Sequence, residues 1–581
     1  MIPLSPIVAD WFAAKGWQAR PHQLAVLEAE RAGNSVLLIA PTGAGKTLAG
    51  FLPSLEDLIE NPMEGLHTLY ISPLKALAVD VARNLGDPVR EMGLKIKVET
   101  RTGDTPASRR QRQRFDPPHI LMTTPEQLAL LLSHPDSVRL FGSLRRIVLD
   151  ELHALVTSKR GDLLSLGVAR LARLSPDVKI TALSATVAQP EILRDWVAAP
   201  VAPNPAVLIN APGGAPPQLS ILASEERLPW AGHSAAYAVP DLYATIKHHG
   251  TTLLFVNTRS QAEMLFQNLW AINDEALPIA LHHGSLSVEQ RRKVESAMVS
   301  GMLRAVVCTS TLDLGIDWGD VDLVVQVGAP KGASRMLQRI GRANHRLDEP
   351  SKAMFVPANR FEVLECEAAL EAVAEGAQDS ETPLPGGLDV LAQHILGLAC
   401  ADPLDEDQTF AEITSAWPYK DLTREKFHRV LDFVSTGGYA LRAYERFAKL
   451  RKTADGLWRI ANPQIAQQYR LNVGTIVEEP MLKVRLVRAR GVRKGATTGP
   501  IGRGGRVLGE IEEYFIDQLV RGDTFMFGGE IIAFEGVVET EAYVSRSFSD
   551  NPKIPSYMGG RFPLSTFLAD KVRKILADPE G

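Results

Sequence analysis

Three features that are scarce or missing in the chain limit what it can be. It has only three cysteines, Cys308, Cys366 and Cys400, which lie too far apart in the sequence for a paired-cysteine zinc site. It contains no apolar run of about 20 residues, the length that spans a bilayer. Its start, Met1 to Trp11, lacks the basic segment, apolar core and small-residue cleavage site of a secretory signal. We therefore expect a cytoplasmic protein with buried thiols and no membrane partner.

The chain also lacks an excess of positive charge. Its 63 lysines and arginines are opposed by 68 aspartates and glutamates, which gives a formal charge of -5. Because a global positive field is absent, any binding of nucleic acid must depend on local basic surfaces. No solenoid-length repeat and no low-complexity segment is present. At 581 residues the chain exceeds the roughly 250 to 300 residues at which one core stops growing, so we expect three or four domains.

Short apolar runs alternate with helical sequence up to residue 380. In the first part of this stretch the runs lie at 35–39, 67–72, 120–123, 146–149 and 179–184, and in the second part at 252–256, 305–308 and 323–327. Such alternation indicates parallel sheets with crossover helices. A passage rich in proline and glycine, residues 200–217, separates the two series. The sequence therefore predicts two α/β domains, at residues 1–215 and 216–380.

The character of the sequence changes after a second proline and glycine cluster at residues 383–387. Amphipathic helices are predicted at 388–400, 409–417 and 423–436, and strand-like segments follow at 439–442 and 456–461. Three helices followed by a two-stranded wing are typical of a winged-helix domain, which we place at residues 381–466. Residues 467–581 are rich in strand-forming sequence with glycine turns, which predicts a β-rich fourth domain.

The segment A-P-T-G-A-G-K-T, residues 40–47, has the spacing of a phosphate-binding loop. Its glycines would let backbone N–H groups approach phosphate oxygens at the start of a helix. The lysine would neutralise the β- and γ-phosphates, and the last threonine would ligate Mg2+. An apolar strand precedes the loop and a helical pattern follows it, so a chance glycine loop is the poorer explanation. The candidate residues are Thr42, Gly43, Ala44, Gly45, Lys46 and Thr47.

Two adjacent carboxylates end the predicted strand in R-I-V-L-D-E-L-H, residues 146–153. Successive residues at a strand end point in different directions. Asp150 can therefore hold Mg2+ while Glu151 orients or deprotonates the attacking water of a phosphoryl transfer. An isolated Asp-Glu pair is often only a solvated acidic turn. That alternative is weaker here, because the pair follows a phosphate loop in the same α/β domain.

Phosphoryl transfer also needs positive charge on the transferring group, commonly an arginine from another domain. The segment Q-R-I-G-R-A-N-H-R, residues 338–346, carries three arginines in the second α/β domain. A surface helix rich in arginine is the alternative. The catalytic candidates from this segment are Gln338, Arg339, Arg342 and Arg346.

With these elements in place, the chain resembles superfamily 2 helicases through an ordered series of motifs. The additional matches are the P-H-Q of a Q motif, P-L-K-A-L, R-T-G-D-T, T-T-P-E, S-A-T, F-V-N-T-R, H-H-G-S-L and T-S-T-L-D-L-G-I-D. The resemblance implies tandem RecA-like parallel-sheet motor domains that use ATP and Mg2+. It implies nucleotide contacts for Gln23, Gly315 and Asp317, and coupling of hydrolysis to domain movement for His153, Ser184 and Thr186. The implied nucleic-acid contacts are Pro73, Lys75, Arg101, Thr102, Gly103, Thr124, Thr258, Arg259, Thr309 and Thr311.

A narrower resemblance is to the Lhr family of large helicase-related proteins, and within it to bacterial ligase-associated DEXH-box helicases. It is carried by I-G-R-A-N-H-R, by the winged-helix region and by P-S-Y-M-G-G-R-F-P-L-S-T at 555–566. It implies an ATPase that depends on single-stranded DNA, movement from 3′ to 5′, and unwinding of duplex or DNA–RNA hybrid in DNA repair. It also implies a DNA ligase or nuclease as candidate partner, and association with the nucleoid if the protein is bacterial. The sequence indicates no oligomeric state.

The chain departs from the family pattern at two places. Many relatives have an arginine where this chain has His345, so Arg342 is a better candidate than Arg346 for the arginine finger. Family members also continue beyond the point that corresponds to Gly581. We therefore expect either a truncation inside the fourth domain or an unusually short member, in which unwinding could be impaired while ATP hydrolysis survives.

Aromatic and basic residues suggest how a strand could be held. Tyr557 lies beside glycine turns where the family often has tryptophan, which predicts an exposed platform for base stacking; a packed loop anchor is the alternative. Basic residues also concentrate where no acid occurs between residues 481 and 506, and alternation there predicts one charged strand face. A second basic group lies at 109–114. Basic runs are usually solvated faces, so both groups remain candidates for phosphate contact. The basic residues are Lys483, Arg485, Arg488, Arg490, Arg493, Lys494, Arg503 and Arg506, and Arg109, Arg110, Arg112 and Arg114.

The leading hypothesis is thus a translocating DNA helicase. An RNA helicase is the near rival, because motifs that touch phosphates do not distinguish the two nucleic acids. An ATP-gated binding scaffold without unwinding is a rival of a different class.

Overall fold

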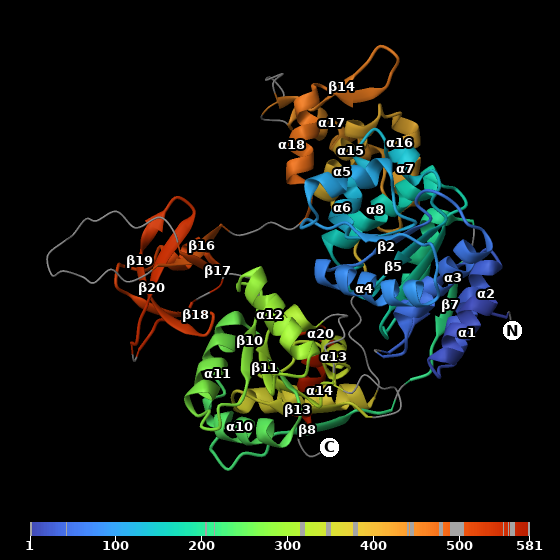
Figure 1. The fold of residues 1–581 in the computed structure, drawn as a ribbon. Helices are drawn as coiled ribbons and strands as arrows, with labels where there is room; N and C mark the ends of the chain where they lie inside the picture. The colour runs from blue at the N-terminus through green and yellow to red at the C-terminus, as the bar shows by residue number, and fades with distance from the viewer. Residues whose placement is uncertain are drawn as a thin grey trace. The chain divides into compact units, whose positions relative to one another are not determined.

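The computed structural model has two compact units (Figure 1). One consists of residues 1–213 and 380–476, and the other of residues 214–379 and 477–581. The structure describes residues 3–41, 43–203, 206–213, 215–313, 320–343, 350–375, 382–438, 441, 447–475, 480–487, 505–549, 551–555, 557 and 564–578. Within these ranges no helix is long and apolar enough to cross a membrane.

The first α/β domain is built on a seven-stranded parallel sheet in the order β3-β4-β2-β5-β6-β1-β7. The strands are β1 (Ser35–Ile39), β2 (Thr68–Ile71), β3 (Val98–Thr100), β4 (Ile120–Thr123), β5 (Arg146–Leu149), β6 (Lys179–Ser184) and β7 (Ala206–Asn210). Four of the five predicted strands are confirmed at both ends, and the fifth, β2, is one residue shorter at each end than predicted. The apolar runs predict these strands well because both faces of a parallel sheet are buried.

Helices cover the faces of this sheet. They are α1 (Pro6–Ala14), α2 (Pro21–Arg31), α3 (Lys46–Glu60), α4 (Lys75–Glu91), α5 (Ala107–Phe115), α6 (Pro125–Leu132), α7 (Ser137–Phe141), α8 (Lys159–Leu174) and α9 (Pro190–Ala198), with 3-10 turns η1 (Leu152–Ala154) and η2 (Ala199–Val201). In α8, Leu164, Val168 and Leu171 repeat at helical spacing and join Ile147 and Leu149 of β5 in one core. This packing buries one face of the sheet under α8.

The helical region of residues 382–475, coloured gold to orange in Figure 1, packs on the first α/β domain. It contains α15 (Leu388–Ala401), α16 (Glu406–Ser415), η5 (Trp417–Tyr419), α17 (Arg424–Thr436), α18 (Pro463–Asn472) and the hairpin β14 (Leu450–Lys452) and β15 (Trp458–Ile460). Leu163 and Leu166 of α8 share a core with Leu391 and Ile395 of α15. The two segments are therefore parts of one packed unit.

Two details of the helical region differ from the sequence-based expectation. The partner of β15 is residues 450–452, whereas residues 439–442 were expected to form the other strand of the wing. Most of that segment lies outside the described residues. In addition, β-rich structure was expected from residue 467, but α18 continues to Asn472 because Tyr469 is buried in the helical core.

The second α/β domain has a six-stranded parallel sheet in the order β10-β11-β9-β12-β13-β8. Its elements are β8 (Gln218–Ile221), η3 (Ala236–Ala238), α10 (Val239–His248), β9 (Thr252–Phe255), α11 (Arg259–Ala271), β10 (Ile279–His282), α12 (Val288–Val299), β11 (Ala305–Cys308), η4 (Ser310–Leu312), β12 (Leu323–Val327), α13 (Ala333–Ile340), β13 (Lys352–Val356) and α14 (Arg360–Ala374). The predicted strands β11 and β12 are confirmed at both ends, and β9 ends one residue earlier than predicted. β8, β10 and β13 lie outside the predicted strands.

The C-terminal part contains a five-stranded sheet in the order β17-β16-β20-β19-β18, which agrees with the predicted β-rich region. Its elements are β16 (Met481–Leu486), β17 (Arg506–Glu512), α19 (Glu513–Ile516), β18 (Thr524–Phe527), β19 (Glu530–Val538) and β20 (Glu541–Arg546), followed by α20 (Thr566–Ala577). Helix α20 was not predicted. Its Leu568 is fully buried in the core of the second α/β domain beside Cys366 and Ala369.

The buried carboxylate of Glu263 fastens the C-terminal sheet to the second α/β domain. Glu263, on α11, accepts hydrogen bonds from the backbone N–H groups of Gly528 (2.6 Å) and Gly529 (2.9 Å) in the turn between β18 and β19. Gln267 donates to the carbonyl oxygen of Gly529 at 2.6 Å. His283 also contacts Glu263, with 3.0 Å between Nε2 and Oε1. The C-terminal sheet and the second α/β domain thus share a buried polar contact.

Candidate active site and strand-binding residues

Strands β5, β6 and β1 are neighbours in the first sheet, and all three run parallel. Their carboxyl ends therefore meet at one edge of the sheet. The loop 40–47 leaves β1 there, residues 150–153 leave β5, and residues 184–186 leave β6. This shared edge brings the three motifs together although they span almost 150 residues of sequence.

The glycines of the phosphate loop have the backbone conformation that the motif requires. Gly43 and Gly45 have φ values of +78° and +74°, where a side chain would be strained, and Gly45 caps the start of α3. A Cβ atom at Gly45 would lie 2.8 Å from Gln23 Nε2. Lys46 Nζ donates to the carbonyl oxygen of Ala40 at 3.1 Å, so the lysine is held across the loop. Thr42 lies outside the described residues.

Two side chains from the start of α2 support the loop from behind. The His22 ring nitrogen Nε2 lies 2.8 Å from the carbonyl oxygen of Ala44, and Gln23 donates to the carbonyl oxygen of Gly45 at 3.3 Å. Gln23 was predicted to contact nucleotide, whereas His22 was quoted only as part of the motif. The structure brings both side chains to the loop, which makes His22 a positioning residue that the sequence had not singled out.

Asp150 and Glu151 follow β5 as predicted, and both are buried. Tyr70 of β2 donates to Asp150 Oδ2, and the Glu151 N–H donates to Asp150 Oδ1 at 2.9 Å. Burial, and then the negative charge of Glu151, raise the pKa of Asp150 to about 6, while the bond from Tyr70 and the charge of Lys46 oppose the rise. The sequence could not identify Tyr70, because it reaches Asp150 only through strand pairing.

His153 connects the carboxylates to the end of β6. Its Nε2 lies 3.6 Å from Glu151 Oε2, and its Nδ1 accepts a hydrogen bond from the Ala185 N–H at 3.2 Å. Ser184 Oγ also lies 3.2 Å from Nδ1 and donates to the carbonyl oxygen of Ala185. Since Nδ1 is an acceptor and burial lowers the pKa of His153, the ring is neutral with its proton on Nε2. Thr186 is exposed in the same loop.

These residues fit ATP and Mg2+. The glycine cradle leaves room for phosphate oxygens at the start of α3, where the helix dipole favours negative charge. The Thr47 hydroxyl in the first turn of α3 and the Asp150 carboxylate are oxygen donors of the kind that Mg2+ prefers. Asp150 accepts two hydrogen bonds, so a carboxylate with about four lone-pair sites retains capacity for a cation.

The predicted strand contacts of the first α/β domain also follow strand ends, but their side chains are mostly enclosed. Arg101, Thr102 and Thr124 are each 4% exposed. The Thr102 hydroxyl accepts from the Asp104 N–H at 3.3 Å, so it stabilises its own loop. Thr124 lies at the start of α6. Pro73 and Gly103 belong to the same edge of the sheet, whereas the side chain of Lys75 lies outside the described part of the chain.

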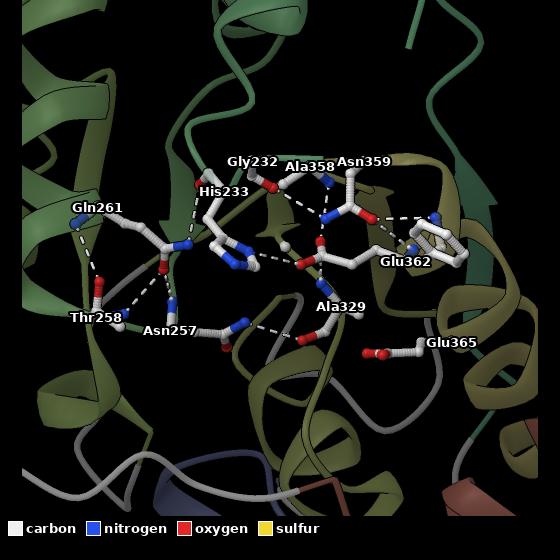
Figure 2. A network of polar contacts seen from close by, with 12 residues as sticks. Gly232, His233, Asn257, Thr258, Gln261, Ala329, Ala358, Asn359, Glu362 and Glu365 are labelled. Atoms are coloured by element: carbon white, nitrogen blue, oxygen red, sulfur yellow. Dashed lines mark hydrogen bonds and ion pairs between the residues drawn. The ribbon is translucent and has the colours of Figure 1, made fainter. Parts of the chain in front are cut away.

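In the second α/β domain, a polar network holds the F-V-N-T-R segment, as Figure 2 shows. Asn257 donates to the carbonyl oxygen of Ala329 at 2.9 Å, and Gln261 Oε1 accepts from the N–H groups of Asn257 (3.1 Å) and Thr258 (3.0 Å). Glu362 accepts from the Ala329 N–H at 3.0 Å. The Thr258 hydroxyl caps α11 by accepting from the Gln261 N–H. The network therefore fixes the ends of β9 and β12 relative to each other.

Arg259 and Tyr557, both predicted to contact nucleic acid, lie against each other. The Arg259 guanidinium is 5.1 Å from the Tyr557 ring centroid and donates to Ser285 Oγ at 3.1 Å. Tyr557 is half-buried, packs on the core of the C-terminal sheet and has an enclosed hydroxyl, so burial raises its pKa. The prediction of an exposed ring is therefore wrong, because the ring packs against its neighbours.

The candidate residues of the arginine-rich segment 338–346 lie in different environments. Arg339 is buried and forms a two-pronged pair with Asp313 (2.7 and 3.2 Å), donates to Gln326 at 2.5 Å, and lies over the Phe255 ring. Its guanidinium is thus committed within the second α/β domain. Arg342 is 3% exposed and Gln338 is half-buried on α13. Arg346, and likewise the nucleotide candidates Gly315 and Asp317, lie outside the described residues.

The remaining predicted contacts are partly engaged. Thr309 directly precedes η4 as its N-cap residue, and Thr311 Oγ1 lies 2.9 Å from His282 Nδ1. On β16, Leu482 and Val484 are buried while Lys483 is exposed, which agrees with the predicted alternation. Arg485 pairs with Glu541, with 2.7 Å between Nε and Oε2, so that cation is already neutralised. Residues 488–504 of the basic run lie outside the described residues.

Comparison with known proteins identifies the family. Residues 20–193 match the model for DEAD/DEAH box helicases, residues 236–346 the model for the helicase conserved C-terminal domain, and residues 371–554 the model for the winged helix domain of large helicase-related protein. The ATP-dependent helicase Lhr-Core of Methanothermobacter thermautotrophicus is 35% identical over 98% of this chain and 67% of its own length. The homologue in Methanocaldococcus jannaschii is 34% identical over 98% of this chain and 66% of its own length.

Solved structures of helicases also match this chain. The helicase Lhr of Mycobacterium smegmatis bound to single-stranded DNA and AMP-PNP matches with a TM-score of 0.73 and 34% identity over 82% of this chain and 63% of that chain. The DNA-bound helicase MrfA has a TM-score of 0.75 at 21% identity over 94% of this chain and 74% of that chain, which supports the fold alone. The chain spans about two thirds of the length of the archaeal relatives. The predicted RecA-like tandem, winged-helix domain and β-rich region are confirmed, and the chain belongs to the Lhr family of ATP-dependent helicases.

Proposed function

We propose that the chain is an ATP-dependent DNA helicase or translocase whose ATPase is stimulated by single-stranded DNA. We further propose that it moves from 3′ to 5′ and unwinds DNA duplex or DNA–RNA hybrid in DNA repair. The observation that carries the proposal is the edge of the first sheet where Lys46, the Asp150 and Glu151 carboxylates, and the His153 to Ser184 contact meet. The Mycobacterium smegmatis homologue, bound to single-stranded DNA and AMP-PNP, supports DNA as the substrate. Direction and repair role rest on family resemblance.

The residues of this edge would supply the phosphate-binding, Mg2+-binding and water-activating groups for hydrolysis of ATP. Lys46 would exchange its contact with the Ala40 carbonyl for the β- and γ-phosphate oxygens. Mg2+, held by Thr47 and Asp150, would supply further neutralisation of the phosphate charge. Glu151 would take a proton from the attacking water as the bond between the β,γ-bridging oxygen and the γ-phosphorus breaks and ADP leaves. We assign the arginine finger to Arg342, which follows α13, and a supporting role to Gln338 on that helix.

The His153 contacts provide a route from hydrolysis to movement. A neutral ring that faces Glu151 on one side and Ser184 and Ala185 on the other responds to any change at the carboxylate. Displacement of Glu151 would therefore be transmitted to the loop that follows β6. This arrangement supports a motor in which hydrolysis alters the position of residues 184–186, and hence the grip on the strand.

The first test is ATP turnover measured with single- and double-stranded DNA and RNA, followed by strand displacement with matched DNA and RNA loading strands. We expect single-stranded DNA to stimulate turnover most and labelled DNA to be released. Equal or better displacement on RNA loading strands would instead indicate an RNA helicase. Stimulated turnover without release of any strand would indicate an ATP-gated binding scaffold.

Substitutions test the assigned residues. Lys46→Ala, or Asp150→Ala combined with Glu151→Ala, should abolish turnover while strand binding is largely retained, and residual wild-type turnover would contradict the assignment. Tyr557→Ala should weaken unwinding with near-normal ATPase. An unchanged displacement rate would show that Tyr557 serves only to pack against Arg259. A DNA ligase or nuclease is the partner that we propose, and co-purification from the native cell tests it.

A further inference from the structure

Positively charged side chains converge where the helical region packs on the first α/β domain. Arg470 of α18 donates to the carbonyl oxygen of Ser133 at 2.6 Å. The neighbouring residue in sequence, His134, faces both Arg470 and the arginines near α5. We call this set the arginine junction; it consists of Arg101, Arg110, Arg114, His134 and Arg470.

The side chains of the junction come from three separate segments. Arg101, after β3, donates through Nη1 to the carbonyl oxygen of Arg110 on α5 at 2.6 Å. Arg114, one turn further along α5, pairs with Asp136 through two contacts of 3.0 Å. Arg470 is brought in by the packing of α18, and its Nε also lies 3.3 Å from Ser133 Oγ. Only the tertiary structure assembles this group.

The junction contains more positive than negative charge. Asp136 is the carboxylate whose charge acts on Arg101, His134 and Arg470, and it is already paired with Arg114. Burial, then Arg470 and Arg114, lower the pKa of His134 to about 4, so the imidazole stays neutral in this field. Burial and the neighbouring arginines likewise lower the pKa of Arg101 to about 10. The local potential is therefore positive.

Two guanidinium groups of the junction also have unused hydrogen-bonding capacity. Arg101 is 4% exposed, and its Nε is enclosed without a hydrogen-bond partner among the described residues. The Nε of Arg110 is likewise enclosed and has no hydrogen-bond partner among the described residues. A buried charged donor that lacks a partner is costly, and it is normally satisfied by an anion or a polar group. An anion would satisfy both the charge and the donors.

Phosphate is the anion whose geometry suits this site. Guanidinium groups bind phosphate oxygens through planar, two-pronged hydrogen bonds. Arg101 also lies in a predicted strand-binding motif, at the carboxyl edge of β3, next to the T-T-P-E segment that follows β4. We propose that the arginine junction binds a phosphodiester of the nucleic-acid strand, so that α18 extends the strand-binding surface of the first α/β domain onto the helical region. The inference rests on the proposed binding of nucleic acid.

The test measures the salt dependence of binding. Labelled oligodeoxythymidylate is titrated with the full chain, without nucleotide, at several KCl concentrations. Each cation that contacts a phosphate of a single strand contributes roughly 0.7 to the slope of log K against log salt. Arg110→Gln and Arg470→Gln should each lower the slope by about 0.7 and the double variant by about 1.4. Arg470→Lys, which keeps the charge, should restore it.

A matched control lies on the same helix. Arg112 of α5 was also a candidate for phosphate contact, but in the structure it donates to Glu99 at 2.6 Å and is exposed, so its charge is compensated outside the junction. Arg112→Gln makes the same charge change in the same helix and should leave the slope at the wild-type value. An equal loss in Arg112→Gln would show that a diffuse field acts rather than a built site, and it would overturn the proposal.

The remaining outcomes separate the junction from a structural role and from the proposed function. If Arg470 only fastened α18 to Ser133, Arg470→Gln would lower the melting temperature and leave the slope unchanged, and Arg110→Gln would do neither. Wild-type slopes in both variants would overturn the phosphate site while strand-stimulated ATPase persisted. If the wild-type chain bound no strand and nucleic acid failed to stimulate its ATPase, the proposed function itself would fail.

Discussion

Asp150→Asn should stabilise the protein at pH 7 while it abolishes ATP turnover. Burial and Glu151 raise the pKa of Asp150 from its ordinary value of 3.8 to about 6. A carboxyl group with a raised pKa holds its proton more tightly in the folded state, so the free energy of unfolding falls as pH rises between these two values. The change corresponds to an upper limit of about 3 kcal/mol. Asparagine carries no charge, and its Oδ1 can accept from the Glu151 N–H while its Nδ2 donates to the Tyr70 hydroxyl.

The assay is calorimetric melting without nucleotide and with a chelator, at pH 7 and at pH 5. For a domain of this size a gain of 1 kcal/mol shifts the melting midpoint by roughly 2 to 4 °C. We therefore expect a rise of up to about 6 to 12 °C at pH 7, from the 3 kcal/mol limit and that scaling. At pH 5 the folded-state Asp150 is largely protonated but the unfolded-state carboxyl is still ionised, so the gain should fall to roughly half of its value at pH 7.

Asp57→Asn is a control for which we expect the opposite change in the melting midpoint at pH 7. The hydrogen bond from His67, and also the charge of Arg146, hold the pKa of Asp57 well below its usual range, against the effect of burial. A lowered pKa stabilises the folded state above the ordinary value, and this stability is lost as pH falls through the lowered pKa. Asp57→Asn should therefore lower the melting midpoint at pH 7. The reasoning is refuted if Asp150→Asn brings no gain at pH 7, or the same gain at pH 5.

Three further predictions concern residues that only the structure identified or placed. Tyr70→Phe removes a hydrogen bond to the Asp150 carboxylate that is worth about 1.5 to 3 kcal/mol. The acid limb of the pH profile of kcat/KM for ATP should therefore move upward by roughly 1 to 2 pH units, and a limb at the wild-type pH would contradict this. Arg339→Lys cannot form the two-pronged pair with Asp313 and should cost roughly 1 to 3 kcal/mol in thermal unfolding; unchanged melting would contradict this. Glu263→Gln loses a buried acceptor and should speed hydrogen exchange at the two glycine amides between β18 and β19, and unchanged exchange would show that the turn is held by other contacts.

Much of the first α/β domain could be predicted because its signals are local. Runs of four to six mostly apolar residues predict β1, β4, β5 and β6. A strand that is buried on both faces has a nearly continuous apolar sequence, which can be recognised without knowledge of its neighbours. Glycines at positive φ and a lysine at the start of α3 follow from the spacing of one short segment. Helix α20 was missed although its apolar residues have helical spacing, because the face it covers lies on α14, some 200 residues earlier.

The sequence by itself determined the two parallel-sheet domains, the order of the motifs, and the residue types that handle phosphate and Mg2+. Tertiary structure decided what those residues touch. Tyr70 reaches Asp150 across paired strands, and Arg339 is held by Asp313. Arg470 reaches Ser133 and His134 only because α18 packs on the first domain. A residue type and its spacing specify backbone shape over a few residues. Contacts between distant segments depend on which faces pack together, and that is settled by the burial of the whole core.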